Sequence, residues 1–257
     1  MDFKLRTPNS ELRTIFQGKS SFDEILLQLT GTRLSAQPVS PRKVLFLGER
    51  TGEISSYVAG WLAGKGIDVI VLDGANRFDP YMASSFARKV FISPERLLKR
   101  IRIARAFTCY QMATLMGERL GSFLKEEEEK PWVILLGPIS TFLDEDVPER
   151  EVRPLFERSL KKIEEMALRG VPFLLFQSNG FSENPPFPPF AKGGVGGLRN
   201  SKRIYLTKRL FQFSNVVWRI DLTEQGANVV PEKVPKKFFC HPELGSGSTT
   251  SEVHPSF

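Results

Sequence analysis

The chain has 257 residues, of which 41% are hydrophobic and 25% charged, and its formal net charge is +7. This length fits one large domain with short appendages. No apolar run approaches the roughly 20 residues that cross a bilayer, and the first residues lack the apolar region of a signal peptide. Two cysteines, Cys109 and Cys240, are too few for a disulfide framework. We therefore predict a globular cytoplasmic protein with no membrane partner.

The positive net charge fits a polyanionic partner such as nucleic acid, but many basic proteins of this size bind none. The charge is also uneven, because Glu126 to Glu129 form an acidic run. Such a run is usually a solvated helix end or loop. Net charge alone therefore leaves nucleic-acid binding open.

The first predicted element is a short helix at Ser20–Leu29, where Ser21 resembles an N-cap and apolar residues follow at helical spacing. We assign residues 1–40 to this helical segment and a Pro/Ser-rich linker. The unbroken apolar run Val44–Leu47 then predicts a strand that is buried on both faces.

The following residues predict a helix at Ser55–Lys65 and a second buried strand at Asp68–Asp73. Strand, helix and strand within about 30 residues form a βαβ unit, which requires a parallel sheet and a right-handed crossover. Further segments repeat the pattern: a helical region at Pro94–Leu124 that Gly117 and Gly121 interrupt, a strand at Trp132–Leu136, an amphipathic helix at Glu151–Leu168 and a strand at Pro172–Gln177.

After Ser201 the pattern changes, and RIYLTKR and NVVWRIDL predict antiparallel strands at the edge of the sheet. We expect an α/β core over residues 41–239, with three layers, a mainly parallel sheet and helices on both faces. Two segments are not expected to belong to this core: the Pro/Gly-rich insertion 184–198 and the tail 240–257, which has too few apolar residues to fold.

Several segments of this core resemble the RecA/RadA-like recombinase family. The similar segments are GERTGEISS (Gly48 to Ser56) beside GEFRTGKTQ, LDGANRFDP (Leu72 to Pro80) beside IDTEGTFRP, WVILLGPISTFL (Trp132 to Leu143) beside the Walker B strand LLIVDSVTALF, and FLLFQSN (Phe173 to Asn179) beside the phosphate-sensor strand. Each is weak alone, but their order and spacing agree over roughly Ser20 to Asp221. The resemblance implies a RecA-like core with the P-loop NTPase fold.

The residues that perform ATP chemistry in this family are replaced. A working phosphate loop needs a lysine that reaches the phosphates and a hydroxyl that binds magnesium. Here Glu53 stands at the lysine position and Ile54 at the hydroxyl position, and the loop from Gly48 to Gly52 is one residue shorter. By the same resemblance, three further family positions are occupied differently: the Walker B aspartate by Gly137, the catalytic glutamate by Ala75 and the phosphate sensor by Gln177.

We therefore expect a degenerate nucleotide site with no catalytic residue and with neither ATP nor magnesium as cofactor. A nucleotide-binding or Rossmann-type enzyme with a reworked site at the carboxyl ends of the strands is an alternative, although G-x-G-x-x-G is absent and Gly48 and Gly52 have the wrong spacing for a Rossmann motif. A structural protein without a ligand is another alternative. No metal site is expected, because His241 and His254 lie in the predicted tail.

The resemblance also implies two DNA-binding loops, at about Leu143–Glu151 and Ser178–Lys202. The first is acidic and therefore unsuited to phosphate contact. The second contains four basic residues that we predict as DNA contacts: Lys192, Arg199, Lys202 and Arg203. A further basic set is expected on one helix, mostly on a solvated face, with Arg105 turned inward or toward a neighbour: Arg96, Lys99, Arg100, Arg102 and Arg105.

The hypothesis that follows is a pseudo-ATPase, a non-catalytic RecA/RadA-like paralogue that serves as an accessory in DNA recombination or repair. Its expected partners are single-stranded DNA, a recombinase or another protein subunit.

Overall fold

The structure, a computed structural model, describes residues 43–125, 129–144, 146–178, 203–223 and 226–234. It is an α/β protein with a seven-stranded sheet in the order β3-β2-β4-β5-β1-β6-β7. The strands are β1 (Lys43–Gly48), β2 (Val69–Asp73), β3 (Ile101–Arg105), β4 (Trp132–Leu136), β5 (Phe173–Ser178), β6 (Val216–Thr223) and β7 (Gly226–Lys233). Neighbouring strands are parallel except for the antiparallel pair of β6 and β7 at the C-terminal edge.

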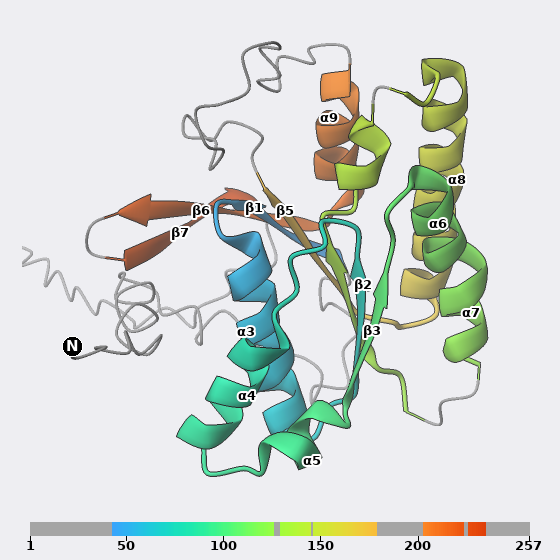
Figure 1. Cartoon of the computed structure of the whole chain (residues 1–257). Coiled ribbons are helices and arrows are strands. Elements are labelled where there is room, and N and C mark those ends of the chain that lie inside the picture. The colour runs from blue at the N-terminus through green and yellow to red at the C-terminus, as the bar shows by residue number, and fades with distance from the viewer. Residues whose placement is uncertain (1–42, 126–128, 145, 179–202, 224–225, 235–257) are drawn as a thin grey trace, which may run out of the picture.

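Helices cover both faces of this sheet, so the fold has the three layers that the sequence predicts (Figure 1). One layer contains α3 (Thr51–Gly64), α4 (Pro80–Lys89) and α5 (Pro94–Leu98). The other contains α6 (Cys109–Thr114), the π-helix η1 (Leu115–Arg119), α7 (Leu120–Phe123), α8 (Glu149–Leu168) and α9 (Ile204–Phe213). A 3₁₀ turn, η2 (Ser140–Leu143), follows β4.

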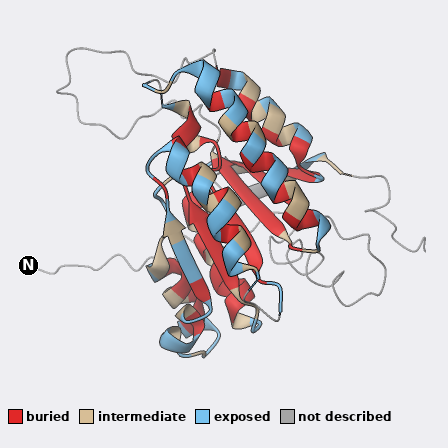
Figure 2. Ribbon diagram, turned by 90° about the vertical axis from the view of Figure 1, so that its right-hand side faces the viewer, coloured by how far each residue is buried: buried red, intermediate tan, exposed pale blue. Residues whose placement is uncertain are grey.

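The central strands form because their side chains are apolar on both faces. Every residue of β1, β2 and β4 is buried, and Figure 2 shows this continuous buried sheet between the helical layers. On the side of α3, the rings of Phe46 and Phe176 stack at 4.9 Å. On the side of α8, Phe142 meets Phe156 edge-to-face at 5.1 Å. The predictions for these strands, and for the helices now seen as α3 and α8, are confirmed.

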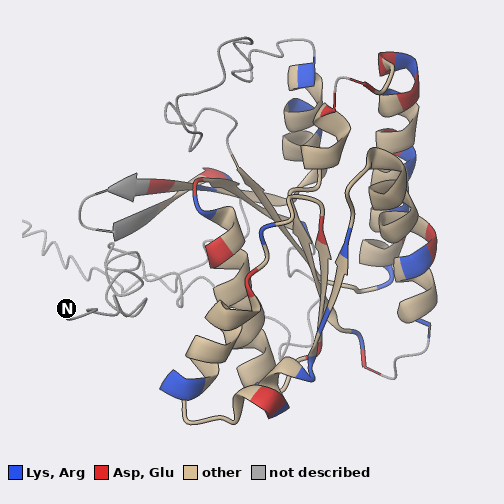
Figure 3. Ribbon diagram, in the orientation of Figure 1, with Lys and Arg blue, Asp and Glu red and all other residues tan. Residues whose placement is uncertain are grey.

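The prediction of one helical region over Pro94–Leu124 is wrong, because β3 interrupts it. β3 lies at the edge of the sheet and pairs in parallel with β2, with Ile101 opposite Val69. Its exposed Arg102 and Arg105 remove the apolar pattern of a strand, so backbone pairing and not side-chain burial defines it. The expected basic helix face is therefore divided among α5, the turn at Lys99 and Arg100, and this edge strand (Figure 3).

The prediction of a strand at RIYLTKR is also wrong, because these residues belong to α9. Leu206, Leu210 and Phe213 are buried along one side of that helix, at the helical spacing of four and three residues. The segment NVVWRIDL does form a strand, β6, but it is parallel to β1 and antiparallel only to β7.

Several sequence predictions fall outside the described residues, namely the helix at Ser20–Leu29, the insertion 184–198 and the tail 240–257. Among the helices that the structure describes, none is long and apolar enough to cross a membrane.

Candidate functional site

The positions that the sequence singled out meet at one edge of the sheet. Parallel strands end at the same edge, which is where open α/β sheets bind their ligands. Across this edge Gly48 lies opposite Ser178, next to Gln177, and Asp73 lies opposite Leu136, next to Gly137. The ends of β1, β5, β4 and β2 therefore bring the residues of the predicted nucleotide site together.

The turn from β1 into α3 is too tight to surround a phosphate group. Only Glu49 and Arg50 separate the strand from the helix, and Arg50 adopts a left-handed backbone with φ of 51°. A Cβ on Gly48 would lie 2.2 Å from the Ile220 carbonyl oxygen, and a Cβ on Gly52 would lie 2.7 Å from that of Arg77. Both glycines are thus needed where other chain segments approach closely.

The positions of the lysine and the hydroxyl serve other purposes. The Arg50 Nε donates to Glu53 Oε1 at 2.8 Å, and the Arg50 Nη2 contacts the second carboxylate oxygen. This partner compensates the negative charge of Glu53, which also benefits from the N-terminal end of the α3 dipole. Ile54 is buried in the apolar core between α3 and the sheet.

The position of the Walker B aspartate has no room for a side chain. Gly137 has a φ of +60°, and a Cβ there would lie 2.6 Å from the Cβ of Ala75 and 2.5 Å from Ser140 Oγ. The loop after β2 lies on this turn, since the Gly74 amide donates to the Leu136 carbonyl at 2.8 Å. Gly137 and Ala75, the two positions that the resemblance connects with magnesium and the attacking water, therefore contact each other.

Asp73 holds this loop in place. Its fully buried carboxylate accepts hydrogen bonds from the amides of Ala75 (3.1 Å), Arg77 (3.3 Å) and Phe78 (2.9 Å). Arg105 approaches the same carboxylate at 3.6 Å and donates to the Phe78 carbonyl at 3.0 Å. Arg105 is thus turned toward its neighbours, as expected, and the loop over Gly137 is fixed from two sides.

Gln177, at the position of the phosphate sensor, is engaged within the chain. The side chain is buried, and its Oε1 accepts from the Ile139 amide at 3.3 Å. Its Nε2 donates to the Ser178 carbonyl at 3.2 Å. The amide therefore joins the turn after β4 to the end of β5 and does not project toward a ligand.

The prediction that Arg203 contacts DNA needs correction, because its guanidinium is buried. The Nη1 donates to the Phe142 carbonyl at 2.7 Å, the Nη2 to that of Val147 at 2.6 Å and the Nε to Glu149 at 3.2 Å. Arg203 thus fixes the segment between η2 and α8. The other residues predicted as DNA contacts lie outside the described residues: Lys192, Arg199 and Lys202.

The described residues contain no cluster of three or more His, Cys, Asp or Glu side chains placed to hold a metal ion. Cys109 is buried, and burial raises the pKa of its thiol. A thiol in such surroundings is unreactive, because the thiolate is the nucleophile.

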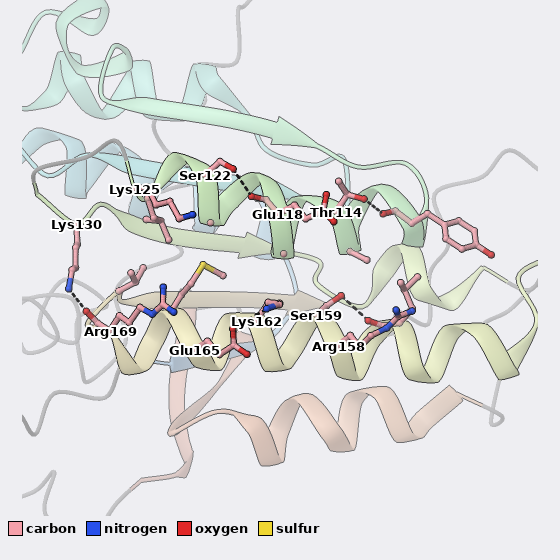
Figure 4. A pocket seen from close by; sticks show the side chains of 18 residues that line it. Thr114, Glu118, Ser122, Lys125, Lys130, Arg158, Ser159, Lys162, Glu165 and Arg169 are labelled. Carbon is pink, nitrogen blue, oxygen red and sulfur yellow. Dashed lines mark hydrogen bonds and ion pairs between the residues drawn. The ribbon is translucent and has the colours of Figure 1, made fainter.

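Sequence reasoning missed a groove between the α6–α7 segment and α8, with a volume of about 680 Å³ (Figure 4). Its only signal was the interruption of the helical pattern at Gly117 and Gly121. No protein-family model matches this sequence, and no curated protein sequence matches it. Function must therefore be inferred from these two features, the closed edge of the sheet and the open groove.

Proposed function

We propose that this protein is a non-catalytic relative of the RecA/RadA-like recombinases that acts by binding, as an accessory in DNA recombination or repair. The observation that carries the proposal is the contact between Gly137 and Ala75. These positions correspond to the two carboxylates that the resemblance connects with magnesium and the attacking water. Neither position carries a carboxylate here. The loop that contains Ala75 occupies the space that a side chain at position 137 would need.

The relationship to the recombinases is supported by where the similar segments lie. ATP chemistry needs the phosphate loop, the magnesium ligand and the sensor in one place. The corresponding segments here end β1, β4 and β5, and these strands are adjacent in the order β4-β5-β1. Their shared edge is the geometry that the resemblance requires.

The loss of catalysis is supported by the contacts that the replaced residues make. Glu53 pairs with Arg50, Ile54 is part of the core, and both polar atoms of Gln177 bond within the chain. A bound triphosphate would also have to displace the loop that Asp73 holds through three amides.

A protein subunit as partner is supported by the edge strand β3, which pairs with β2 alone among the described strands. An edge strand can be extended by a strand of another chain. Ile103 on this strand and Phe107 just after it are exposed, at 40% and 66%. They provide apolar contacts at this edge.

Nucleotide binding tests the non-catalytic part of the proposal. We expect no ATP hydrolysis by the pure protein. A ligand that binds the native state raises the melting temperature, so we also expect that Mg-ATP leaves the melting temperature unchanged. Saturable hydrolysis that disappears in Glu53→Ala but persists in Glu95→Ala, a change on exposed α5, would refute it. A rise in melting temperature without hydrolysis would favour a reworked nucleotide site.

DNA binding tests the accessory role. Fluorescent single-stranded DNA should bind in the micromolar range, weaken steeply as salt is raised and be indifferent to ATP, because phosphate contacts release counterions. Absence of binding at low salt would contradict a DNA-binding accessory and leave a protein that acts through protein partners alone.

A further inference from the structure

The groove beside α8 is held open by ties at both of its ends. At one end the Tyr110 hydroxyl donates to Glu151 on α8 at 2.6 Å. At the other end the Lys130 ammonium donates to the Arg169 carbonyl, just after α8 (Figure 4). The first tie joins α6 to α8, and the second joins the segment before β4 to the residue that follows α8, so the segments that border the hollow are fixed at both of its ends.

Two glycines keep the middle of the groove open. Apart from its chain neighbours and the backbone of its own helix, a Cβ on Gly121 would meet no described atom within 4 Å, and a Cβ on Gly117 would meet only the Cγ of Lys162, at 3.8 Å. By contrast, a Cβ on Gly60 in α3 would lie 3.1 Å from the Cα of Ala83, so packing explains that glycine. Glycine inside a helix is unfavourable relative to alanine. No contact within the described chain requires glycine at positions 117 and 121. An occupant that packs closely against this wall of the groove would require it.

The backbone conformation of this wall also supports a binding site in the groove. Gly117 belongs to the π-helix η1, Leu115–Arg119, which separates α6 from α7. Single π-helical turns within helices are rare and are frequently found at functional sites. This turn lies in the wall opposite α8.

The lining of the groove combines an apolar surface with basic margins. Its apolar side chains include Leu124, Leu155, Met166 and Val171. Its basic side chains are Lys125, Lys130, Arg158, Lys162 and Arg169. Among the described residues of the lining, the acidic side chains are Glu118 and Glu165, and the second pairs with Lys162 at 3.1 Å. Within this described lining, basic side chains therefore outnumber acidic ones around an apolar surface.

We propose that this groove binds an acidic amphipathic helix of a partner protein. Aliphatic side chains of that helix would lie on the apolar surface, its backbone would approach Gly117 and Gly121, and its carboxylates would face the basic margins. Helices commonly bind in this way, through apolar residues at positions i, i+3, i+4 and i+7.

A single nucleic-acid strand fits this lining less well. Its phosphates would match the basic margins, but its bases need aromatic side chains to stack on. Tyr110 is the one aromatic residue among the described residues of the lining. The apolar surface is otherwise aliphatic, which favours a peptide.

This inference rests on one part of the proposed function, namely that the protein acts by binding. It adds the chemical class of one binding partner.

The test uses the full chain and a fluorescein-labelled helical peptide of about 16 residues, with Leu at helical spacing and Glu elsewhere. This length matches the wall from Leu155 to Arg169, which rises about 21 Å. Fluorescence anisotropy should show saturable binding that weakens with salt. A peptide with Lys in place of Glu should bind at least about tenfold more weakly, because like charges repel.

Variants of the chain locate the binding. A triple variant that reverses three positive charges of the groove should weaken peptide binding by at least about tenfold: Arg158→Glu, Lys162→Glu and Arg169→Glu. The matched control makes the same change of charge in the opposite helical layer, at exposed residues of α4 and α5: Arg88→Glu, Lys89→Glu and Arg96→Glu. Gly121→Leu fills the groove without changing charge and should abolish binding while the melting temperature does not fall.

Several results would overturn the inference. Equal weakening by both triple variants would mean general attraction between charges. Single-stranded DNA that binds in place of the peptide, and is lost in the same variants, would make the groove a nucleic-acid site. A dimer that Gly121→Leu dissociates would identify a second copy as the occupant. Peptide binding that is seen only in the variant Asp23→Lys with Glu24→Lys would identify the chain's own segment Ser20–Leu29 as the occupant of the groove.

These outcomes are independent of the proposed function. Absence of peptide binding refutes the groove inference and leaves the closed nucleotide site and the DNA assay unaffected. Conversely, ATP hydrolysis or a lack of DNA binding refutes parts of the proposed function, whatever the peptide does.

Discussion

At the carboxyl edge of the sheet a Cβ on Gly137 would lie 2.6 Å from the Cβ of Ala75, whereas in the groove beside α8 a Cβ on Gly121 would meet no described atom within 4 Å apart from its chain neighbours and the backbone of its own helix. In the sequence the two glycines look alike. The first stands where the resemblance to the recombinases places a carboxylate, and a neighbouring loop occupies the space that a side chain there would need. The second leaves a surface open, so the surroundings of each glycine separate a closed site from one that is ready to bind.

The charged groups of the two regions differ in the same way. At the edge of the sheet the carboxylates of Glu53 and Asp73 are satisfied within the chain. In the groove Arg158 and Arg169 form no ion pair with any residue that the structure describes. Their charge is available to a partner. The following substitutions test whether the edge is closed and the groove open.

The largest effect is expected for Gly137→Asp, which introduces the acidic residue that the resemblance places at this position. A non-glycine residue at φ +60° is strained, and its side chain would overlap Ala75 and Ser140. We expect the free energy of unfolding, measured by urea denaturation, to fall by about 3 kcal/mol. The control is Gly66→Asp, where φ is +82° but no atom lies within 4 Å; its loss should be about 1 kcal/mol. Equal losses would show that the edge is not closed.

A somewhat smaller loss is expected for Asp73→Ala. It removes the acceptor of three amides, of which that of Phe78 is buried. The free energy of unfolding should fall by about 2–3 kcal/mol, because unsatisfied donors near the core are costly. Hydrogen exchange at the Ala75, Arg77 and Phe78 amides should accelerate. Continued protection of these amides would mean that Asp73 does not hold the loop.

Gln177→Ala should have an intermediate effect. It leaves the buried Ile139 amide without its acceptor, so stability should fall by about 1.5 kcal/mol. Gln212→Ala, at an exposed position of α9, is the matched control and should change stability by less than about 0.5 kcal/mol. If the two variants unfold at the same urea concentration, the structural role assigned to Gln177 is wrong.

The smallest effect, and the only gain, is expected for Gly121→Ala. Its Cβ would enter open space, and alanine favours the helix by about 1 kcal/mol over glycine. Gly60→Ala should instead be destabilising, because its Cβ would press against Ala83. Thermal unfolding of the two variants measures whether each substitution raises or lowers stability. A loss of stability in Gly121→Ala would show that the groove is not open at this point.

The elements that the sequence predicted well are those whose signal is local. Val44–Leu47 and Trp132–Leu136 are unbroken apolar runs, and each became a buried central strand. The periodic apolar positions of α8 likewise predicted a helix, which begins two residues earlier than expected, at Glu149. The acidic Glu53 and the apolar Ala75, at positions where the resemblance places a lysine and a glutamate, were also evident from the sequence, because the chemistry of a side chain follows from its identity.

The elements and contacts that were mispredicted depend on partners far along the chain. β3 is a strand because β2 supplies its hydrogen bonds, and its own side chains are largely exposed. Arg203 was expected on the surface, yet it donates to the Phe142 carbonyl, 61 residues away. Composition and spacing describe a residue's own preferences, whereas burial and hydrogen bonding depend on the segments that the fold brings beside it. The closing of the edge over Gly137 and the opening of the groove at Gly121 are decided by that packing.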